Sequence, residues 1–453
     1  MKKWLLAAGI FVGASALQAQ TPLPLKVSEN RRFFETSDGK PFFWLGDTGW
    51  LLFVKCNRED VIKYLDTRKK QGFNVIQVMV LHDVRKAKNA YGDSALINGD
   101  ISRPRVSADP DNYWNHISFV IDEAAKRGIY IALVPVWGSN VKSGYVNAAQ
   151  ARVYARFLAE RYGSKSNILW VNGGDIRGTE GQEVWKTIGE TLKQYDPSHL
   201  VTYHPRGRYS SSEWFKNAAW MDFNMFQSGH RTYAQDTSAN EKNHFGEDNW
   251  KYVVKDYQLQ PVKPVLDGEP SYENIPHGLH DSLAARWTAA DLRRYGYWSV
   301  FAGGAGFTYG ENAVMQFHTK GDAGANYGVN MNWKDAVKSA GADQMLYLKL
   351  LMLSHSYFDR TPAPELLPHN NGKQYEHLVA TKGSNYAYVY TYTGKPFEVD
   401  QAQLGFVPSK AQWYDPATGN PRDAVPAKTA AIAKYTPPAR RADGSDWVLI
   451  LDK

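Results

Sequence analysis

Apolar and polar positions along this chain repeat in units of an amphipathic helix, a glycine and a short apolar strand. In the first clear unit, a polar capping pattern at 57–60 opens a helix that extends to Gln71, and Gly72 separates it from an apolar strand at 73–80. Two further units follow, with helices at 113–127 and 148–162, glycines Gly128 and Gly163, and strands at 129–136 and 167–171. Glycine suits the left-handed position that ends a helix, and apolar strands alternating with helices indicate parallel pairing.

The remaining strands are predicted from shorter apolar runs. They lie at 42–47 (strand 1), 200–203 (strand 5), 221–226 (strand 6), 264–267 (strand 7) and 298–308 (strand 8). Eight such units fit residues 30–355, so the predicted fold class is α/β, with a (β/α)8 TIM barrel. A doubly wound open sheet is the alternative topology. It is less favoured because acids, aromatics and histidines stand at the ends of many strands rather than at one crevice.

The pattern changes after Tyr357. Turn-rich segments at 361–364 and 368–372 are followed by short strands at 377–381, 386–391, 411–414 and 447–451. This pattern predicts a small C-terminal antiparallel β-sandwich, in which Trp413 and Trp447 are expected to be core residues. The predicted domains are therefore a signal peptide at 1–19, a catalytic barrel at 20–357 and the β-sandwich at 358–453.

The N-terminal segment has the form of a secretory signal peptide. Lys2 and Lys3 precede an apolar stretch at 4–17, and small residues allow cleavage after Ala19 or Ala16. The stretch is too short to span a membrane, so we expect an exported protein, periplasmic or extracellular, without a membrane anchor. The formal charge is +7, and its basic residues are scattered, which argues against nucleic acid as a partner. The single cysteine, Cys56, is expected to be a buried small hydrophobe.

Two carboxylates stand at the ends of predicted strands and are the candidate catalytic pair. Asp175 ends the run 167–175, and Glu269 ends the run 264–269, about three strand–helix units of ~31 residues later. Both would project from one rim of the barrel, where two facing carboxyl groups can cleave a glycosidic bond. Asp175 is the candidate general acid/base and Glu269 the candidate nucleophile, with an expected carboxyl separation of ~5–5.5 Å for a retaining enzyme.

Each of these assignments has an alternative. Asp175 could instead cap the following helix, and Glu269 could form an ion pair with Arg286 or Arg293. Asp267 and Glu273 are neighbouring candidates for the nucleophile, although Asp267 lies deeper in the strand and Glu273 farther along the loop.

Other polar and aromatic residues recur at the same predicted rim. The candidate substrate-binding residues are Asp47, Trp50, His82, Trp137, Asn172, His204, Gln227 and Tyr309, and His230 follows strand 6. Asp47 could accept hydrogen bonds from sugar hydroxyls, or serve only as a local turn cap. Sequence motifs for metal sites, phosphate loops and serine nucleophiles are lacking, so no metal and no cofactor are expected.

Four motifs together resemble one family. They are 46–50 (GDTGW), 172–175 (NGGD), 267–273 (DGEPSYE) and 303–310 (GGAGFTYG), and they resemble those of the apiosidase-like glycoside hydrolases. The C-terminal segment with 413–419 (WYDPATG) is similar to the small β domain that accompanies them, which carries the label of a collagen-binding domain.

The resemblance implies a retaining barrel glycosidase that releases apiose-linked units from the side chains of the pectin rhamnogalacturonan II. It places Asp175 at the acid/base position and Glu269 at the nucleophile position. The expected partner is a pectic oligosaccharide, and a monomer is expected. The alternatives are a glycosidase of the same fold acting on another plant or host glycan, and a non-catalytic glycan- or collagen-binding protein.

Overall fold

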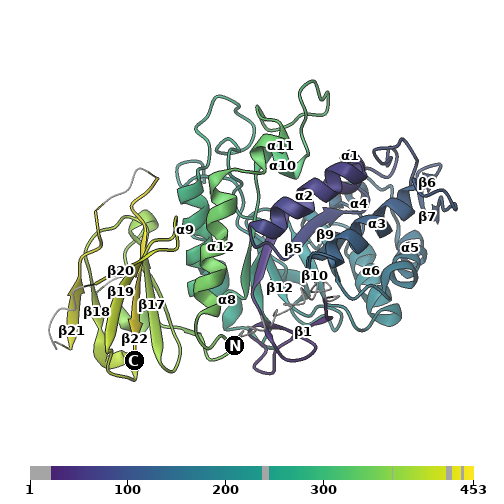
Figure 1. Ribbon diagram of the computed structural model, residues 1–453. Helices are drawn as coiled ribbons and strands as arrows, with labels where there is room; N and C mark the ends of the chain where they lie inside the picture. The colour runs from purple at the N-terminus through teal and green to yellow at the C-terminus, as the bar shows by residue number, and fades with distance from the viewer. Residues whose placement is uncertain (1–21, 237–243, 370, 425–430, 440–442) are drawn as a thin grey trace, which may run out of the picture.

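The computed structural model describes residues 22–236, 244–369, 371–424, 431–439 and 443–453. The predicted signal peptide lies outside these residues. The described residues form a barrel and a β domain (Figure 1). The barrel consists of eight parallel strands. They are β4 (Trp44–Thr48), β5 (Val75–Met79), β8 (Tyr130–Val134), β9 (Ile168–Ile176), β10 (Val201–Pro205), β12 (Asn224–Gln227), β13 (Val265–Asp267) and β14 (Gly306–Tyr309).

The order of the strands gives a closed barrel rather than an open sheet. Hydrogen-bonded neighbours run β10-β9-β8-β5-β4-β14-β13-β12, and the short β11 (Tyr209–Ser210) pairs antiparallel with β12. At the seam between β10 and β12, the Asp222 N–H donates to the Val201 carbonyl at 2.8 Å and the Thr202 hydroxyl to the Phe223 carbonyl at 2.6 Å. The predicted (β/α)8 fold class is confirmed.

Longer helices cover the outside of the barrel. They are α2 (Arg58–Lys70), α3 (Tyr113–Ala125), α5 (Ala148–Tyr162), α6 (Gln182–Tyr195), α8 (Asn249–Tyr257), α9 (Ala289–Phe301) and α12 (Ala340–Leu353). Short helices lie in the connecting segments: α1 (Leu52–Lys55), α4 (Gly138–Lys142), α7 (Ser212–Phe215), α10 (Asn312–Met315) and α11 (Trp333–Ala336). Two small antiparallel sheets complete this part, one of β1 (Leu25–Val27), β2 (Phe34–Thr36) and β3 (Pro41–Phe42), the other of β6 (Leu96–Ile97) and β7 (Asp100–Pro104).

The local signals explain where the helices begin and end. The Asn57 side chain caps α2 by accepting from the Asp60 N–H, and Asn147 forms a reciprocal capping box with Gln150 at the start of α5. Gly72 has the left-handed φ of +82° expected at a helix end, whereas Gly163 has φ −62°. A Cβ at Gly163 would lie 2.5 Å from the Ala159 carbonyl oxygen, so close packing rather than a left-handed turn requires glycine there.

The largest error in a predicted strand boundary is at the start of strand 8. Residues 298–301, taken as the start of strand 8, are the last turn of α9, and β14 begins only at Gly306. Every residue of α9 from Leu292 to Phe301 is buried, because this helix packs between the barrel and the β domain. A helix that is apolar on all sides loses the 3.6-residue period and resembles a buried strand.

The C-terminal segment forms two antiparallel sheets around a separate apolar core. The larger sheet has the order β15 (Thr361–Pro362), β16 (Val379–Lys382), β17 (Tyr386–Thr391), β22 (Trp447–Asp452), β19 (Lys410–Tyr414) and β20 (Pro421–Asp423). The smaller pairs β18 (Phe397–Asp400) with β21 (Ile432–Tyr435). Side chains of both sheets share one cluster, so the predicted sandwich is confirmed. Trp413 and Trp447 are 3% and 0% exposed, as predicted for core residues.

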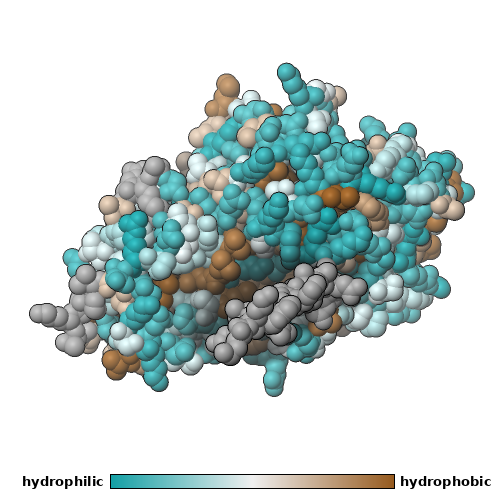
Figure 2. Space-filling view, viewed as in Figure 1, coloured by the Kyte–Doolittle hydropathy of each residue, from teal (hydrophilic) through white to brown (hydrophobic). Residues whose placement is uncertain are grey.

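The β domain packs on α9 and α12 (Figure 1). Tyr390 stacks on Tyr297 of α9 with ring centroids 4.8 Å apart, and Arg293 of the same helix forms an ion pair of 2.8 Å with Asp446. The surface near this junction is the most hydrophobic part of the face shown in Figure 2, and Leu350 and Leu353 of α12 are 52% and 38% exposed. In the described part of the chain, none of the helices is both long and apolar enough to span a membrane.

Candidate active site

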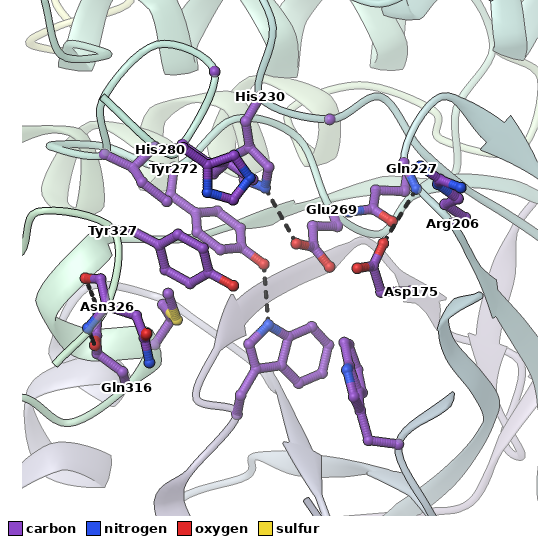
Figure 3. A pocket seen from close by; sticks show the side chains of 18 of the residues that line it. Asp175, Arg206, Gln227, His230, Glu269, Tyr272, His280, Gln316, Asn326 and Tyr327 are labelled. Carbon is purple, nitrogen blue, oxygen red and sulfur yellow. Dashed lines mark hydrogen bonds and ion pairs between the residues drawn. The ribbon is translucent and has the colours of Figure 1, made fainter. Parts of the chain in front are cut away.

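A pocket of about 350 Å³ opens at the carboxyl ends of the barrel strands. Both candidate catalytic carboxylates line it (Figure 3). Six of the residues predicted for the site lie in its wall: Trp50, His82, Trp137, Asp175, Gln227 and Glu269. The pocket is therefore assembled from loops at many strand ends, as is usual for active sites of this fold.

Asp175 reaches the pocket through a bulge at the end of β9. His204 of β10 pairs with Gly173, but the next residue, Pro205, pairs with Ile176, so Gly174 and Asp175 are inserted without partners. Gly173, Gly174 and Asp175 have φ values of +88°, +117° and +48°. This left-handed run turns the Asp175 side chain out of the sheet and into the pocket.

The two glycines are required by this geometry. A Cβ at Gly174 would lie 2.5 Å from the Trp137 ring, and one at Gly173 would lie 2.6 Å from the His204 carbonyl oxygen. Asp175 itself is a non-glycine residue with positive φ, a strained conformation that tends to occur at functional sites. Because α6 begins at Gln182 with Gly181 as its N-cap, Asp175 does not cap the following helix.

Glu269 follows β13 and points into the same pocket, toward Asp175 (Figure 3). Its Oε2 lies 2.9 Å from Nε2 of His204, and its Oε1 lies 3.2 Å from Nε2 of His230. The alternative ion pairs with Arg286 and Arg293 do not form: Arg286 donates to the carbonyls of Asn274 and Gly328, and Arg293 pairs with Asp446.

The surroundings separate the proton affinities of the two carboxyl groups. Asp175 is exposed to the pocket, but the pocket walls surround it and limit its access to bulk water. This partial desolvation and the charge of Glu269 raise the pKa of Asp175 to about 6. Burial alone would raise the pKa of Glu269, but hydrogen bonds and charge from His204 and His230 outweigh it and lower that pKa to about 2. At a pH between these two pKa values, Asp175 is protonated and Glu269 is ionised. This is the arrangement that an acid and a nucleophile require.

Neither neighbouring carboxylate lines the pocket. The Asp267 carboxylate is fully buried and accepts from Ser228 and Asn249, each at 2.9 Å, and burial raises its pKa to about 7. Glu273 accepts from the Tyr309 hydroxyl at 2.6 Å and the Gly341 N–H at 3.0 Å. Both side chains hold the loop after β13 rather than face the cavity.

Aromatic rings form the wall beside the carboxylates. The rings of Trp50 and Trp137 lie 5.2 Å apart, and the His204 ring lies 5.4 Å from Trp50 and 5.6 Å from Trp137. The Trp50 indole N–H donates to the Tyr272 hydroxyl at 3.1 Å. Indole faces beside two carboxylates suit the C–H faces of a sugar ring.

Four predicted substrate-binding residues lie outside the wall of the pocket. Asp47 is fully buried and is bound by Tyr64 and by Arg68, whose Nε lies 2.6 Å from Oδ2. A strand-end carboxylate was expected to face ligand, but the fully buried Arg68 of α2 requires a counter-charge, and Asp47 supplies it. The Tyr309 side chain is fully buried, and its hydroxyl donates to the Glu273 carboxylate.

The other two support the catalytic residues from behind. Asn172 donates to the Trp185 carbonyl at 2.6 Å and accepts from the Gly173 N–H at 3.0 Å, which fixes the start of the bulge. His204 is fully buried and contacts Glu269, so it shapes the site without forming its surface.

Sequence reasoning missed several residues of the pocket wall. Arg206, Arg208 and Arg231 follow β10 and β12, while His280, Gln316, Asn326 and Tyr327 come from two long loops around β14. Tyr327 has φ +57°, and the charges of Glu269 and Asp175 contribute to raising its pKa, after burial. Its loop carries no apolar period, so no sequence signal placed it here.

Within the described ranges, no group of three or more His, Cys, Asp or Glu side chains is arranged to hold a metal ion. Cys56 is buried, as predicted.

Comparisons with known proteins agree with this site. Residues 28–359 match the family described as "Apiosidase-like, catalytic domain", and residues 361–452 match the "Putative collagen-binding domain of a collagenase". A solved structure titled "Glycoside hydrolase" is 42% identical, with a TM-score of 0.89, over 96% of this chain and 99% of that chain.

Two further solved structures are similar to different degrees. A glycoside hydrolase family 5 protein from Bacteroides vulgatus is 40% identical, with a TM-score of 0.90, over 96% of this chain and 94% of that chain. An endo-1,4-beta-D-mannanase from Thermotoga petrophila is 15% identical, with a TM-score of 0.50, over 68% of this chain and all of that chain, and shows the fold alone. No match was found among proteins with curated functions.

The barrel and these relatives define the protein as a glycoside hydrolase, so its substrate is a carbohydrate. The non-catalytic alternative is thereby set aside. Within that class, the chain belongs to the apiosidase-like family.

Proposed function

We propose that this protein is a retaining glycosidase in which Glu269 is the nucleophile and Asp175 the general acid/base. The observation that carries the proposal is that both carboxyl groups line one pocket, with that of Glu269 held by His204 and His230 and that of Asp175 by neither. These surroundings move the two pKa values apart, to about 6 for Asp175 and to about 2 for Glu269.

The reaction then has two steps. Glu269 attacks the anomeric carbon while Asp175 gives its proton to the departing glycosidic oxygen, and a glycosyl-enzyme forms. Asp175, now a carboxylate, takes a proton from water, which attacks the same carbon and releases the sugar and Glu269. Two inversions leave the anomeric configuration unchanged, which NMR of the first-formed product tests. An inverted product would remove the nucleophile role of Glu269.

The proposed substrate is an apiose-containing side chain of rhamnogalacturonan II. The family membership supports apiose as the sugar. The exposed Arg206 in the pocket wall suits an acidic pectic chain. Gln227 also lines the pocket, and among the described residues its buried Oε1 has no hydrogen-bond partner, so this amide is suited to accept from a sugar hydroxyl once a sugar enters.

Product analysis after digestion of purified rhamnogalacturonan II, with and without EDTA, tests this substrate. An apiose-terminated fragment released equally in both samples supports the proposal. Cleavage of other glycans alone would remove apiose but retain the hydrolase class.

We also propose export, on the strength of the signal-peptide pattern at 1–19. N-terminal sequencing of the protein recovered outside the cytoplasm should begin near residue 20, after Ala19, or near residue 17, after Ala16. An intact Met1 in that fraction would contradict cleavage.

A further inference from the structure

A buried carboxylate joins the catalytic barrel to the β domain. Glu247 is 1% exposed, and its Oε1 accepts from the Tyr233 backbone N–H at 2.7 Å and from the Tyr375 hydroxyl at 3.1 Å. Its Oε2 lies 2.7 Å from Nη2 of Arg294. Tyr375 belongs to the β domain, whereas Tyr233, Glu247 and Arg294 belong to the barrel, so one side chain connects the two parts.

The guanidinium of Arg294, which pairs with Glu247, is enclosed by four aromatic rings. Arg294 is fully buried, and its guanidinium lies 4.7 to 5.1 Å from the ring centroids of Tyr295, Trp298, Tyr375 and Tyr392. Two of these rings belong to the barrel and two to the β domain. A buried charge in an aromatic enclosure needs its counter-ion, which fixes Glu247 in place.

Glu247 in turn fixes a loop of the pocket, residues 230–236. His230 at the start of this loop contacts Glu269, and Asp236 at its end pairs with Arg208 of the pocket wall. Besides the Tyr233 hydrogen bond to Glu247, three further hydrogen bonds hold this segment. The Gly278 N–H donates to the His230 carbonyl at 2.8 Å, the Tyr233 hydroxyl to Asp248 at 2.6 Å, and the Gln235 amide to the His277 carbonyl at 3.0 Å. The Tyr233 and Tyr375 rings also meet edge to face, with centroids 5.2 Å apart.

We propose that Tyr375 of the β domain is a positioning residue for the glycosidase reaction, acting through Glu247 and Tyr233 to keep His230 against Glu269. The inference rests on the proposed function, because it takes Glu269 as the nucleophile. It assigns the β domain a part in the active site rather than a glycan-binding role of its own. That agrees with the burial of Trp413 and Trp447, which offer no exposed indole face for stacking.

The proposal predicts a specific change in the pH dependence of kcat/KM. The titratable groups around Glu269 are Asp175 from β9, His204 from β10, His230 and Tyr272 from the loops after β12 and β13, and Tyr327 from the loop after β14. Among these, only His230 lies on the loop that Tyr375 holds. Displacing it removes one of two imidazoles from Glu269, so the acidic limb of kcat/KM moves to higher pH.

The test is Tyr375→Phe in the full-length protein. The ring stays, and the residue is 39% exposed, so the fold is retained. We expect faster amide hydrogen exchange in residues 230–236, kcat/KM lower by about 3- to 10-fold, and an acidic limb raised by up to about one pH unit. The matched control is Tyr435→Phe, which removes a β-domain hydroxyl that accepts from the Gln401 amide at 3.0 Å and should leave all three measurements unchanged.

Two outcomes would overturn the inference. The first is unchanged exchange at 230–236 in Tyr375→Phe. The second is a lower kcat/KM with an unmoved acidic limb, which would mean a general structural effect. If the wild-type protein cleaves no pectic substrate, the proposed substrate fails, but the exchange measurement still decides whether Tyr375 orders the loop.

Discussion

His204 lies between the two residues of the catalytic pair and contacts both. Its Nε2 is 2.9 Å from Oε2 of Glu269, and its Nδ1 is 3.4 Å from the backbone nitrogen of Asp175. The ring is fully buried and packed against Trp50 and Trp137. The positions of the two carboxyl groups proposed as acid and nucleophile are therefore linked through one buried imidazole.

Replacing the nucleophile should stop turnover. Glu269→Gln keeps the shape of the side chain but cannot attack the anomeric carbon, so kcat should fall by more than ~10³-fold. Asp122→Asn on α3, an ordinary surface carboxylate paired with Lys165, is the control and should retain full activity. Near-normal turnover by Glu269→Gln would exclude it as the nucleophile.

The loss of activity on replacing Asp175, the proposed acid, should depend on the leaving group of the substrate. Asp175→Asn cannot donate a proton, so hydrolysis of natural glycosides should fall by ~10²- to 10⁴-fold. Aryl glycosides whose leaving group is an acidic phenol need little protonation, so the rate of their hydrolysis should fall far less. The measurement is kcat/KM across a series of leaving groups, and an equal loss for all of them would contradict the acid role.

The pH dependence follows from the two displaced pKa values. Asp175 must be protonated and Glu269 ionised, so activity is present between about 2 and about 6 and declines as pH rises through about 6. The kcat/KM profile for a substrate with a poor leaving group should show this basic limb. In Asp175→Asn the limb should vanish, and its persistence would assign it to another group.

The bulge should not tolerate a side chain at Gly174. Gly174→Ala places a Cβ against the Trp137 ring at a φ of +117°, which should shift Asp175 and lower kcat by about 10²-fold. Gly39→Ala is a matched control, since Gly39 also has positive φ, +83°, but open space around its Cβ position. If both variants were equally active, steric exclusion at the bulge would be disproved.

Asp47 should matter for stability rather than for binding. Asp47→Asn leaves the Arg68 charge buried without its counter-ion, so the free energy of unfolding should drop by about 3–5 kcal/mol. Asp66→Asn, which breaks the half-exposed pair with Arg127, should cost no more than about 1 kcal/mol. Urea unfolding measures both. A raised KM for Asp47→Asn with unchanged stability would restore its predicted contact with substrate.

Local patterns were sufficient for the parts of the fold that local physics decides. The helix α5, with its Asn147 capping box, has the predicted bounds, and β17 was placed correctly by its apolar run. The end of helix α9 was misjudged because residues 295–301 are all buried and include no charged residue, so this part of the helix shows no polar face. The strands β18 and β21 were missed because each has only four residues, too few for a period-two pattern to be recognised.

The candidate site also contains residues that local sequence patterns could place and residues whose position depends on tertiary packing. Asp175 and Glu269 were found because strand ends in this fold converge on one rim. The burial of Asp47 could not be foreseen, since it depends on Arg68 from the next helix. Tyr327 and the link through Tyr375 depend on loop paths and domain packing, which leave no periodic trace in sequence.

The bulge in β9 also determines which acid the site can use. Two inserted residues carry the backbone itself toward the cavity, so the short side chain of aspartate is long enough to bring its carboxyl group into the pocket. A glutamate at the same place would extend about 1.5 Å farther, by one carbon–carbon bond, and would meet the space that the sugar needs. Backbone path and side-chain length are thus matched, and Asp175→Glu would need a straightened strand before it could serve as the acid.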